Sequence, residues 1–313
     1  MLDANSTKPN MFSRFRRKTE KVEDGKKLGL GQQILIQLFL LTISFIVIYP
    51  LLWIFSLSID SRNISRPIAL TLIPDEASFQ AYASVIERPT ANPVSFWQLA
   101  FNSFRLALGT SAASVLIGVL AAYAFARFRF PGRQILMIMV LTVLMLPSIA
   151  TLPALFVLLN KVIIGGFNLR NSLLGVGFAM LSGMLPFAIW NLKGYLDTIP
   201  KELEEAALID GCNTNQAFFK IILPLAVPVL AVTAFLGFMS GWTEFAISWQ
   251  FLTNPKDFTL TMALFNMIGQ YAAGTPWSKF AAYSIMVALP VSVVYLFLQK
   301  YMVSGLTIGG VKG

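Results

Sequence analysis

The sequence has 313 residues, of which 56% are hydrophobic and only 12% are charged. Soluble domains carry about 25% charged residues, so this chain has too little charge to cover a water-facing surface. It has no histidine and a single cysteine, which excludes a His-dependent catalytic triad, a His-based zinc site and an intrachain disulfide. The net charge of +9 does not indicate nucleic-acid binding, because the basic residues form no stripe with interleaved aromatics. These features predict an all-α protein that crosses a membrane several times.

Six apolar stretches are long enough to cross about 30 Å of hydrocarbon as helices of roughly 20 residues. They are 34–59, 106–126, 135–160, 171–192, 221–251 and 280–299. Several contain prolines, which we interpret as kinks, because a backbone inside a bilayer must satisfy its own hydrogen bonds. The first stretch starts too late and is too long for a cleaved signal peptide, so we expect it to stay in the protein as an anchor.

The lysines and arginines predict the orientation of these helices. Sixteen of the 24 lie on the side of the two termini, and seven lie on the opposite side. The positive-inside rule therefore places both termini in the cytosol. The expected order is a cytosolic tail, a first transmembrane helix, an external loop, a core of five more helices with a cytosolic loop, and a cytosolic C-terminal tail. These segments are 1–33, 34–59, 60–98, 99–300 with its loop 196–224, and 301–313.

The cytosolic loop 196–224 has the composition of two short helices joined by a turn. Pro200 suits the first position of a helix, and three glutamates follow where the positive end of the helix dipole favours carboxylates. Gly211 is placed to end this helix in a left-handed conformation, and Asn213 or Thr214 is placed to cap the next one. A helix lying on the membrane surface would be basic, so the acidic start favours a protein partner.

Seven residues of this loop stand at the spacing of a known motif. They are Glu205, Ala206, Ala207, Gly211, Ile221, Leu223 and Pro224. In type and spacing they resemble the EAA motif of ATP-binding-cassette (ABC) importer permeases. The resemblance implies the type I importer permease fold, in which this loop forms a coupling helix that docks on a separate ATPase subunit. The chain would then be a non-catalytic membrane subunit without a cofactor, ATP and magnesium being bound by the ATPase. The sequence contains no P-loop, which agrees with this interpretation.

Three further segments resemble the second permease subunit of maltose-type sugar importers. They are 122–133, 193–195 and 303–313. The resemblance covers roughly 34–313 and implies a bacterial or archaeal cell membrane as the location and a sugar as the substrate. It implies an ATPase dimer, a second homologous permease and an external solute-binding protein as partners. In such systems the C-terminal tail reaches the ATPase dimer, and the resemblance extends this role to Gly309, Gly310 and Lys312. The identity of the sugar stays open.

Glu244 is the only carboxylate within a predicted span. A charge at mid-membrane costs about 2–3 kcal/mol on insertion scales, so Glu244 either faces a polar translocation path or lies at a water boundary because the helix breaks near Trp242. Tryptophans near the predicted ends of helices are typical of interfacial belts, with stacking on sugar rings as the alternative. They are Trp53, Trp190, Trp242, Trp249 and Trp277. Asn266, Gln270 and Tyr271 lie in the external loop before the last span, where any of them could meet an external partner.

An ion-coupled secondary transporter is the alternative function. Such a protein would usually show more spans, internal repeats and several ionisable residues inside the membrane. The sequence shows one such residue and no convincing repeat.

Overall fold

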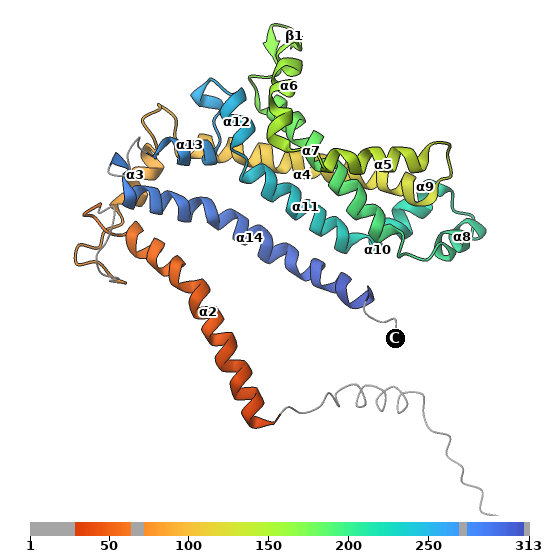
Figure 1. The fold of residues 1–313 in the computed structure, drawn as a ribbon, viewed down its shortest axis with the longest axis horizontal. Helices are drawn as coiled ribbons and strands as arrows, with labels where there is room; N and C mark the ends of the chain where they lie inside the picture. The colour runs from red at the N-terminus through yellow and green to blue at the C-terminus, as the bar shows by residue number, and fades with distance from the viewer. Residues whose placement is uncertain (1–28, 64–71, 269–273, 310–313) are drawn as a thin grey trace, which may run out of the picture. The chain divides into compact units, whose positions relative to one another are not determined.

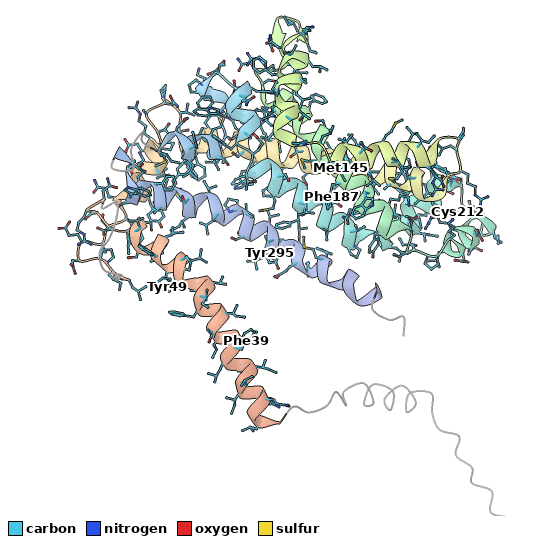
Figure 2. The ribbon with its side chains drawn as sticks, in the orientation of Figure 1. Phe39, Tyr49, Met145, Phe187, Cys212 and Tyr295 are labelled. Atoms are coloured by element: carbon cyan, nitrogen blue, oxygen red, sulfur yellow. The ribbon has the colours of Figure 1, made fainter. Side chains whose placement is uncertain are left out.

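The computed structural model describes residues 29–63, 72–268 and 274–309 (Figure 1). The chain divides into two compact units, Met1–Trp53 and Ile54–Gly313. The boundary falls within helix α2 (Leu30–Ser58), which contains Pro50 and no charged residue. Side chains such as those of Phe39 and Tyr49 project outward around this helix (Figure 2). A helix that is apolar on all sides suits contact with lipid.

The second unit is built from helices of very different lengths. They are α3 (Gln80–Glu87), α4 (Phe96–Arg127), α5 (Arg133–Leu144), α6 (Ser148–Asn160), α7 (Leu173–Leu196), α8 (Glu202–Ile209), α9 (Thr214–Ala217), the π-helix η1 (Phe218–Ile222), α10 (Leu223–Leu225), α11 (Val227–Trp242), α12 (Ala246–Phe251), the 3-10 helix η2 (Pro255–Asp257), α13 (Leu260–Asn266) and α14 (Trp277–Gly309). Two residues on each side of a tight turn, β1 (Ile163–Ile164) and β2 (Phe167–Asn168), pair as an antiparallel hairpin. The predicted all-α class is therefore correct apart from this hairpin.

Four helices of the described residues are long and apolar enough to cross a membrane. They are α2, α4, α7 and the part of α14 at Trp277–Met302. A fifth span is present if Thr214–Leu225 and Val227–Trp242 count as one helix bent by 75°. The predicted count of six spans therefore remains a prediction.

Two predicted spans are not continuous helices. The span 135–160 consists of α5 and α6, which are separated at Pro147, a residue with extended backbone and no N–H to donate. The span 221–251 bends between α10 and α11, then ends at Trp242, and α12 begins at Ala246. The prediction of one kinked helix at Pro147 is wrong, and the break near Trp242 was predicted only as an alternative, because the apolar composition continues through each break.

The centre of the second unit is the packing of α4 against α7 and α11, with α14 on the other side of α11 (Figure 1). Gly237 and Gly241 on α11 allow the backbones to approach closely. A Cβ atom added at Gly241 would lie 2.5 Å from Thr110 Oγ1 and 2.6 Å from Ala107 Cα. Small residues at such contacts are the usual way in which membrane helices gain packing.

Two helices extend beyond their predicted spans. α4 begins at Phe96 instead of 106 and, with 32 residues, is about 48 Å long. This is longer than the hydrocarbon core, which is about 30 Å thick. α14 continues to Gly309, so most of the predicted tail 301–313 is helical.

Candidate functional site

The first part of the loop 196–224 is the short helix α8. Three carboxylates stand in its first turn, as predicted: Glu202, Glu204 and Glu205. The helix begins slightly later than expected, with Lys201 as its N-cap residue and Pro200 before the cap. The carboxylates lie where the unpaired amides of the first turn favour negative charge.

A left-handed turn ends α8. Gly211 has φ of 89°, a conformation that other residues adopt only with strain. The Cys212 N–H donates to the Ala207 carbonyl at 2.9 Å, and the Gly211 N–H donates to the Leu208 carbonyl at 3.1 Å. These two bonds form a Schellman motif, and the predicted left-handed helix end is confirmed. Figure 2 shows Cys212 at this turn, beside α8.

Asn213, one of the two predicted candidates, caps the following helix. Its Oδ1 accepts from the Gln216 N–H, and the Gln216 Oε1 accepts from the Asn213 N–H, both at 2.9 Å. After α9 the chain passes through η1, a turn of π-helix that places Ile222 in the core and leaves Ile221 half-buried. Single π turns inside helices are often found at functional sites.

A buried ion pair fixes α8 to the end of α4. Arg127 Nε lies 2.6 Å from Glu204 Oε1, and the two side chains are only 5% and 14% exposed. Arg127 Nη2 donates to the Ile199 carbonyl at 2.9 Å, and the Tyr123 hydroxyl donates to Glu204 Oε2 at 3.3 Å. Among the described residues, Arg127 Nη1 is buried without a hydrogen-bond partner. Since a buried charge without its partner is costly, separating α8 from α4 is strongly disfavoured while water is excluded.

Aromatic and aliphatic packing supports the ion pair. The Tyr123 and Phe218 rings have centroids 4.6 Å apart, so α4 also touches η1. Leu196 at the end of α7 and Ile222 of η1 are fully buried in the same cluster. The loop therefore packs tightly against both α4 and α7.

The seven motif residues are divided between the core and the surface. Glu205, Ala206, Gly211 and Pro224 are exposed, Ala207 is buried, and Ile221 and Leu223 are half-buried. Apolar side chains accompany the exposed residues of α8, with Ile209 87% exposed and Leu208 47% exposed. An exposed apolar group beside carboxylates is typical of a protein-docking surface.

The C-terminal residues of the predicted ATPase contact are only partly described. Gly309 is the last residue of α14. Gly310 and Lys312 lie outside the described residues.

Glu244 lies in the break between α11 and α12, and not within a span. Its carboxylate accepts from the Ile247 N–H at 2.6 Å, from the Ser248 N–H at 3.0 Å and from the Ser248 hydroxyl, and so caps α12. The break predicted as the alternative is confirmed, but Glu244 is only 8% exposed. It lines a cavity of about 750 Å³ together with Ser182 and Ser240.

Sequence reasoning missed Arg127 and Tyr123. Both lie in the segment 122–133, which had been used only as a resemblance to a subgroup of permeases. The Arg127–Glu204 pair joins residues 77 positions apart, a separation that no helical periodicity reveals. An arginine at the end of an apolar helix and a glutamate in a surface loop were the available signals.

These features define a class: a polytopic membrane protein with a rigidly anchored helix–turn–helix on one side. The chain belongs to the family of binding-protein-dependent transport system inner membrane components, whose sequence model matches residues 114–307. The match includes the loop, both ends of its ion pair and the residues around the cavity.

Curated relatives cover almost the same length. The galactooligosaccharides transport system permease protein GanQ of Bacillus subtilis is 37% identical over 276 residues, which is 88% of this chain and 94% of the relative. The maltose/maltodextrin transport system permease protein MalG of Escherichia coli K12 is 34% identical over 281 residues, which is 85% of this chain and 91% of the relative. A chain of a bacterial ABC transporter involved in the import of the acidic polysaccharide alginate has the same fold, with a TM-score of 0.68, 24% identity and coverage of 88% of this chain and 98% of that chain.

Proposed function

We propose that this chain is the membrane-spanning permease subunit of an ABC importer that brings an oligosaccharide into the cytosol. The observation that carries the proposal is the anchored loop: α8 presents exposed Glu205 and Ala206 at the motif spacing, and the Arg127–Glu204 pair ties it to α4. The names of the curated relatives, which specify galactooligosaccharides and maltose or maltodextrin, support a sugar as the substrate.

In this proposal the chain does no covalent chemistry and binds no cofactor. A separate ATPase dimer binds ATP and magnesium and receives α8, while a second permease completes the membrane unit and an external solute-binding protein delivers the sugar. Both termini lie in the cytosol, and Gly309, Gly310 and Lys312 approach the ATPase dimer. Closure of the dimer on ATP moves α8, and the buried ion pair passes this movement to α4.

The cavity beside Glu244 is the proposed part of the translocation path on this chain. It combines an apolar lining with serine hydroxyls, which suits the passage of a neutral polyol. The Glu244 carboxylate already accepts hydrogen bonds from the first N–H groups of α12, so it is not available to bind a sugar. We therefore assign Glu244 the role of shaping this path by maintaining the break between α11 and α12.

The test is an affinity purification of the tagged chain from solubilised membranes, followed by mass spectrometry. We expect recovery of an ATPase and a second permease from the wild type, and loss of the ATPase from Gly211→Asp and Glu205→Lys at unchanged membrane abundance. Glu87→Lys is the matched control, because it makes the same charge change on an exposed glutamate of α3, at the other end of α4.

Two results would count against the proposal. Recovery of this chain alone, under conditions that keep a known ABC complex intact, would remove the assembly. Sugar uptake that an ionophore stops and ATP depletion does not would favour the ion-coupled alternative.

A further inference from the structure

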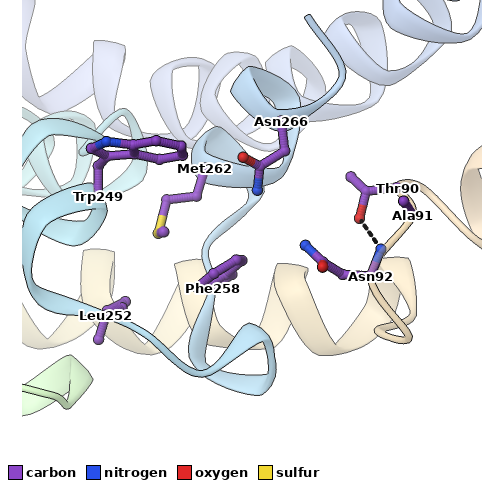
Figure 3. A pocket seen from close by; sticks show the side chains of 8 residues that line it. All are labelled: Thr90, Ala91, Asn92, Trp249, Leu252, Phe258, Met262 and Asn266. Atoms are coloured by element: carbon purple, nitrogen blue, oxygen red, sulfur yellow. Dashed lines mark hydrogen bonds between the residues drawn. The ribbon is translucent and has the colours of Figure 1, made fainter. Parts of the chain in front are cut away.

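A hollow of about 420 Å³ lies where α12, α13 and the segment before α4 meet (Figure 3). Aromatic and apolar side chains form its walls, among them Trp249, Phe258 and Met262. Asn92 and Asn266 point toward it from opposite elements (Figure 3). A hollow of this volume is within the usual range of small-molecule sites, which is about 300–1,000 Å³.

Trp249 is held in place and yet keeps half of its surface open. Its ring lies 5.7 Å from that of Phe245 and 5.1 Å from that of Phe265, the second contact being edge-to-face. The side chain is nevertheless 49% exposed. An indole that is fixed by its neighbours but not covered by them offers a rigid apolar plane at low entropic cost.

The polar groups of the hollow are neutral and available. Within the described residues, the side-chain amides of Asn92 and Asn266 make no hydrogen bond, while the Asn92 backbone N–H donates to the Thr90 hydroxyl at 3.3 Å. Each amide group can accept and donate at once, which matches the adjacent hydroxyls of a sugar. No side chain that lines the hollow is charged, and the guanidinium of the neighbouring Arg88 already donates to the Ala91 carbonyl at 2.7 Å, so the hollow itself offers a carboxylate only neutral partners.

The hollow and the coupling loop lie at opposite ends of α4. Thr90 and Asn92 precede the start of α4, and Arg127 at its end contacts α8. α4 has 32 residues and a length of about 48 Å, and the two sites lie toward its opposite ends (Figure 1). If α8 faces the cytosol, the hollow lies on the side from which an imported sugar arrives.

We propose that this hollow is a binding subsite for one ring of a neutral oligosaccharide at the external mouth of the permease. Trp249 stacks on the apolar face of the ring, and Asn92 and Asn266 bond its hydroxyls. The inference rests on the proposed import function and adds a site and a preference to it: neutral rings are accepted, and uronic acids are not. A lipid chain would leave both amides without partners, which makes it the poorer occupant.

The test uses the chain with its partner subunits in lipid nanodiscs, without the solute-binding protein. The probes are maltotetraose, β-1,4-galactotetraose and an alginate tetrasaccharide, and the readout is tryptophan emission in the wild type minus that in Trp249→Phe. We expect at least one neutral tetrasaccharide, and not the alginate one, to change the Trp249 signal. The same sugars are then measured by ligand-observed NMR with each variant.

Loss of one stacking plane or one pair of hydrogen bonds weakens binding by about five- to tenfold. We expect this change for Trp249→Ala, Asn92→Ala and Asn266→Ala, while Trp249→Phe keeps an aromatic plane and most of the affinity. Trp190→Ala is the matched control, because Trp190 is also 49% exposed but lies on α7, outside the hollow.

Three outcomes would overturn the inference. The first is an absence of any Trp249 response up to about 10 mM neutral sugar. The second is equal binding of the alginate probe. The third combines an unchanged sugar titration in the variants with a loss, in a parallel ATPase assay with the solute-binding protein added, of stimulation by that protein. This result would make the hollow a binding site for a protein segment. ATP-driven uptake that persists in each case leaves the proposed import function intact, whereas its absence in the wild type removes that function.

Discussion

The two ends of α4 are attached to the rest of the molecule by different chemistry. At one end, Arg127 and Glu204 form an ion pair that is almost sealed from water. At the other end, the Asn102 side-chain amide donates to the carbonyls of Lys256 at 2.7 Å and Phe258 at 2.9 Å. The first contact joins charges, and the second joins neutral groups.

The difference has mechanical consequences. A dry charge pair resists separation because each partner would be left uncompensated, so α4 and α8 move together. Neutral hydrogen bonds contribute about 1 kcal/mol each, so the contacts of the buried Asn102 resist separation less than the ion pair does. The end of α4 near the hollow is therefore held less strongly, while the end near α8 transmits movement.

The largest expected effect comes from breaking the charged attachment. Arg127→Ala and Glu204→Ala should each lower the free energy of unfolding by about 3–5 kcal/mol, because the remaining charge is buried alone. The double variant Arg127→Leu/Glu204→Leu should recover most of this stability, while sugar uptake per ATP hydrolysed stays low. Thermal unfolding in detergent and coupled transport assays measure the two quantities.

The control for this prediction is Lys193→Ala, which removes an exposed pair with Asp197 that spans one helical turn. We expect a change of only about 0.5 kcal/mol there. An Arg127→Ala variant no less stable than Lys193→Ala would show that the buried pair does not fix the loop.

The neutral attachment should give a smaller effect. Asn102→Ala leaves the Phe258 carbonyl without its side-chain donor and the Lys256 carbonyl with only the long bond from Gln98, which costs about 1–3 kcal/mol. Transport coupling at saturating sugar should be unchanged, in contrast to the Arg127 variants. Gln98→Ala serves as the comparison, because Gln98 reaches the Lys256 carbonyl only at 3.5 Å. Equal losses in the two variants would contradict the role given to Asn102.

A substitution in the turn after α8 should have a smaller effect on stability than breaking the Arg127–Glu204 pair. Gly211→Ala should cost about 1–2 kcal/mol, since alanine is strained at φ of 89°. Gly194→Ala is the matched control: Gly194 lies in the helix α7, and a Cβ atom there meets nothing within 4 Å. That variant should be neutral or slightly more stable, because alanine favours helix. Thermal unfolding of the two variants side by side gives the answer.

The smallest effect concerns pH at the opposite end of α4. Hydrogen bonds from the Arg62 side chain lower the pKa of Asp60, partly offset by burial. A lowered folded-state pKa contributes stability above the unfolded pKa, near 4, and this contribution disappears as pH falls through the folded value. The melting temperature of the wild type should therefore exceed that of Asp60→Asn at pH 7, and this difference, at about the limit of detection, should shrink as the pH falls below about 4. A difference that grows on acidification would contradict this sign.

Much of the fold is predictable from composition, because long apolar runs have one stable form in a bilayer. This is why α2 and α7 were found within a few residues of their ends, and α14 within a few residues of its start. The break at Pro147 was not found, and the break after Trp242 was predicted only as an alternative, because the residues around them are as apolar as those of the helices. At the second break, the capping of α12 by Glu244 decides where the helix ends, and this depends on one side chain.

The candidate site was predictable only where it is local. The Gly211 turn and the Asn213 cap follow from neighbouring residues and were anticipated. The Arg127–Glu204 pair and the meeting of Asn92 with Asn266 depend on how distant segments pack, and neither residue type nor spacing specifies that packing. Trp249 had been interpreted as part of an interfacial belt, with stacking on sugar rings as the alternative, and its open face beside two amides favours that alternative.

The π turn η1 also constrains how the length of this loop can change over evolution. Each residue of a helix turns the chain by about 100°, and the π turn accommodates one residue more than an α turn would. Deleting a single residue within 218–222 would return the turn to α geometry and leave α11 close to its present orientation, whereas deleting a residue of α11 before Gly237 would rotate Gly237 and Gly241 away from α4. Relatives are therefore expected to differ in length by one residue at this turn more readily than within the first part of α11.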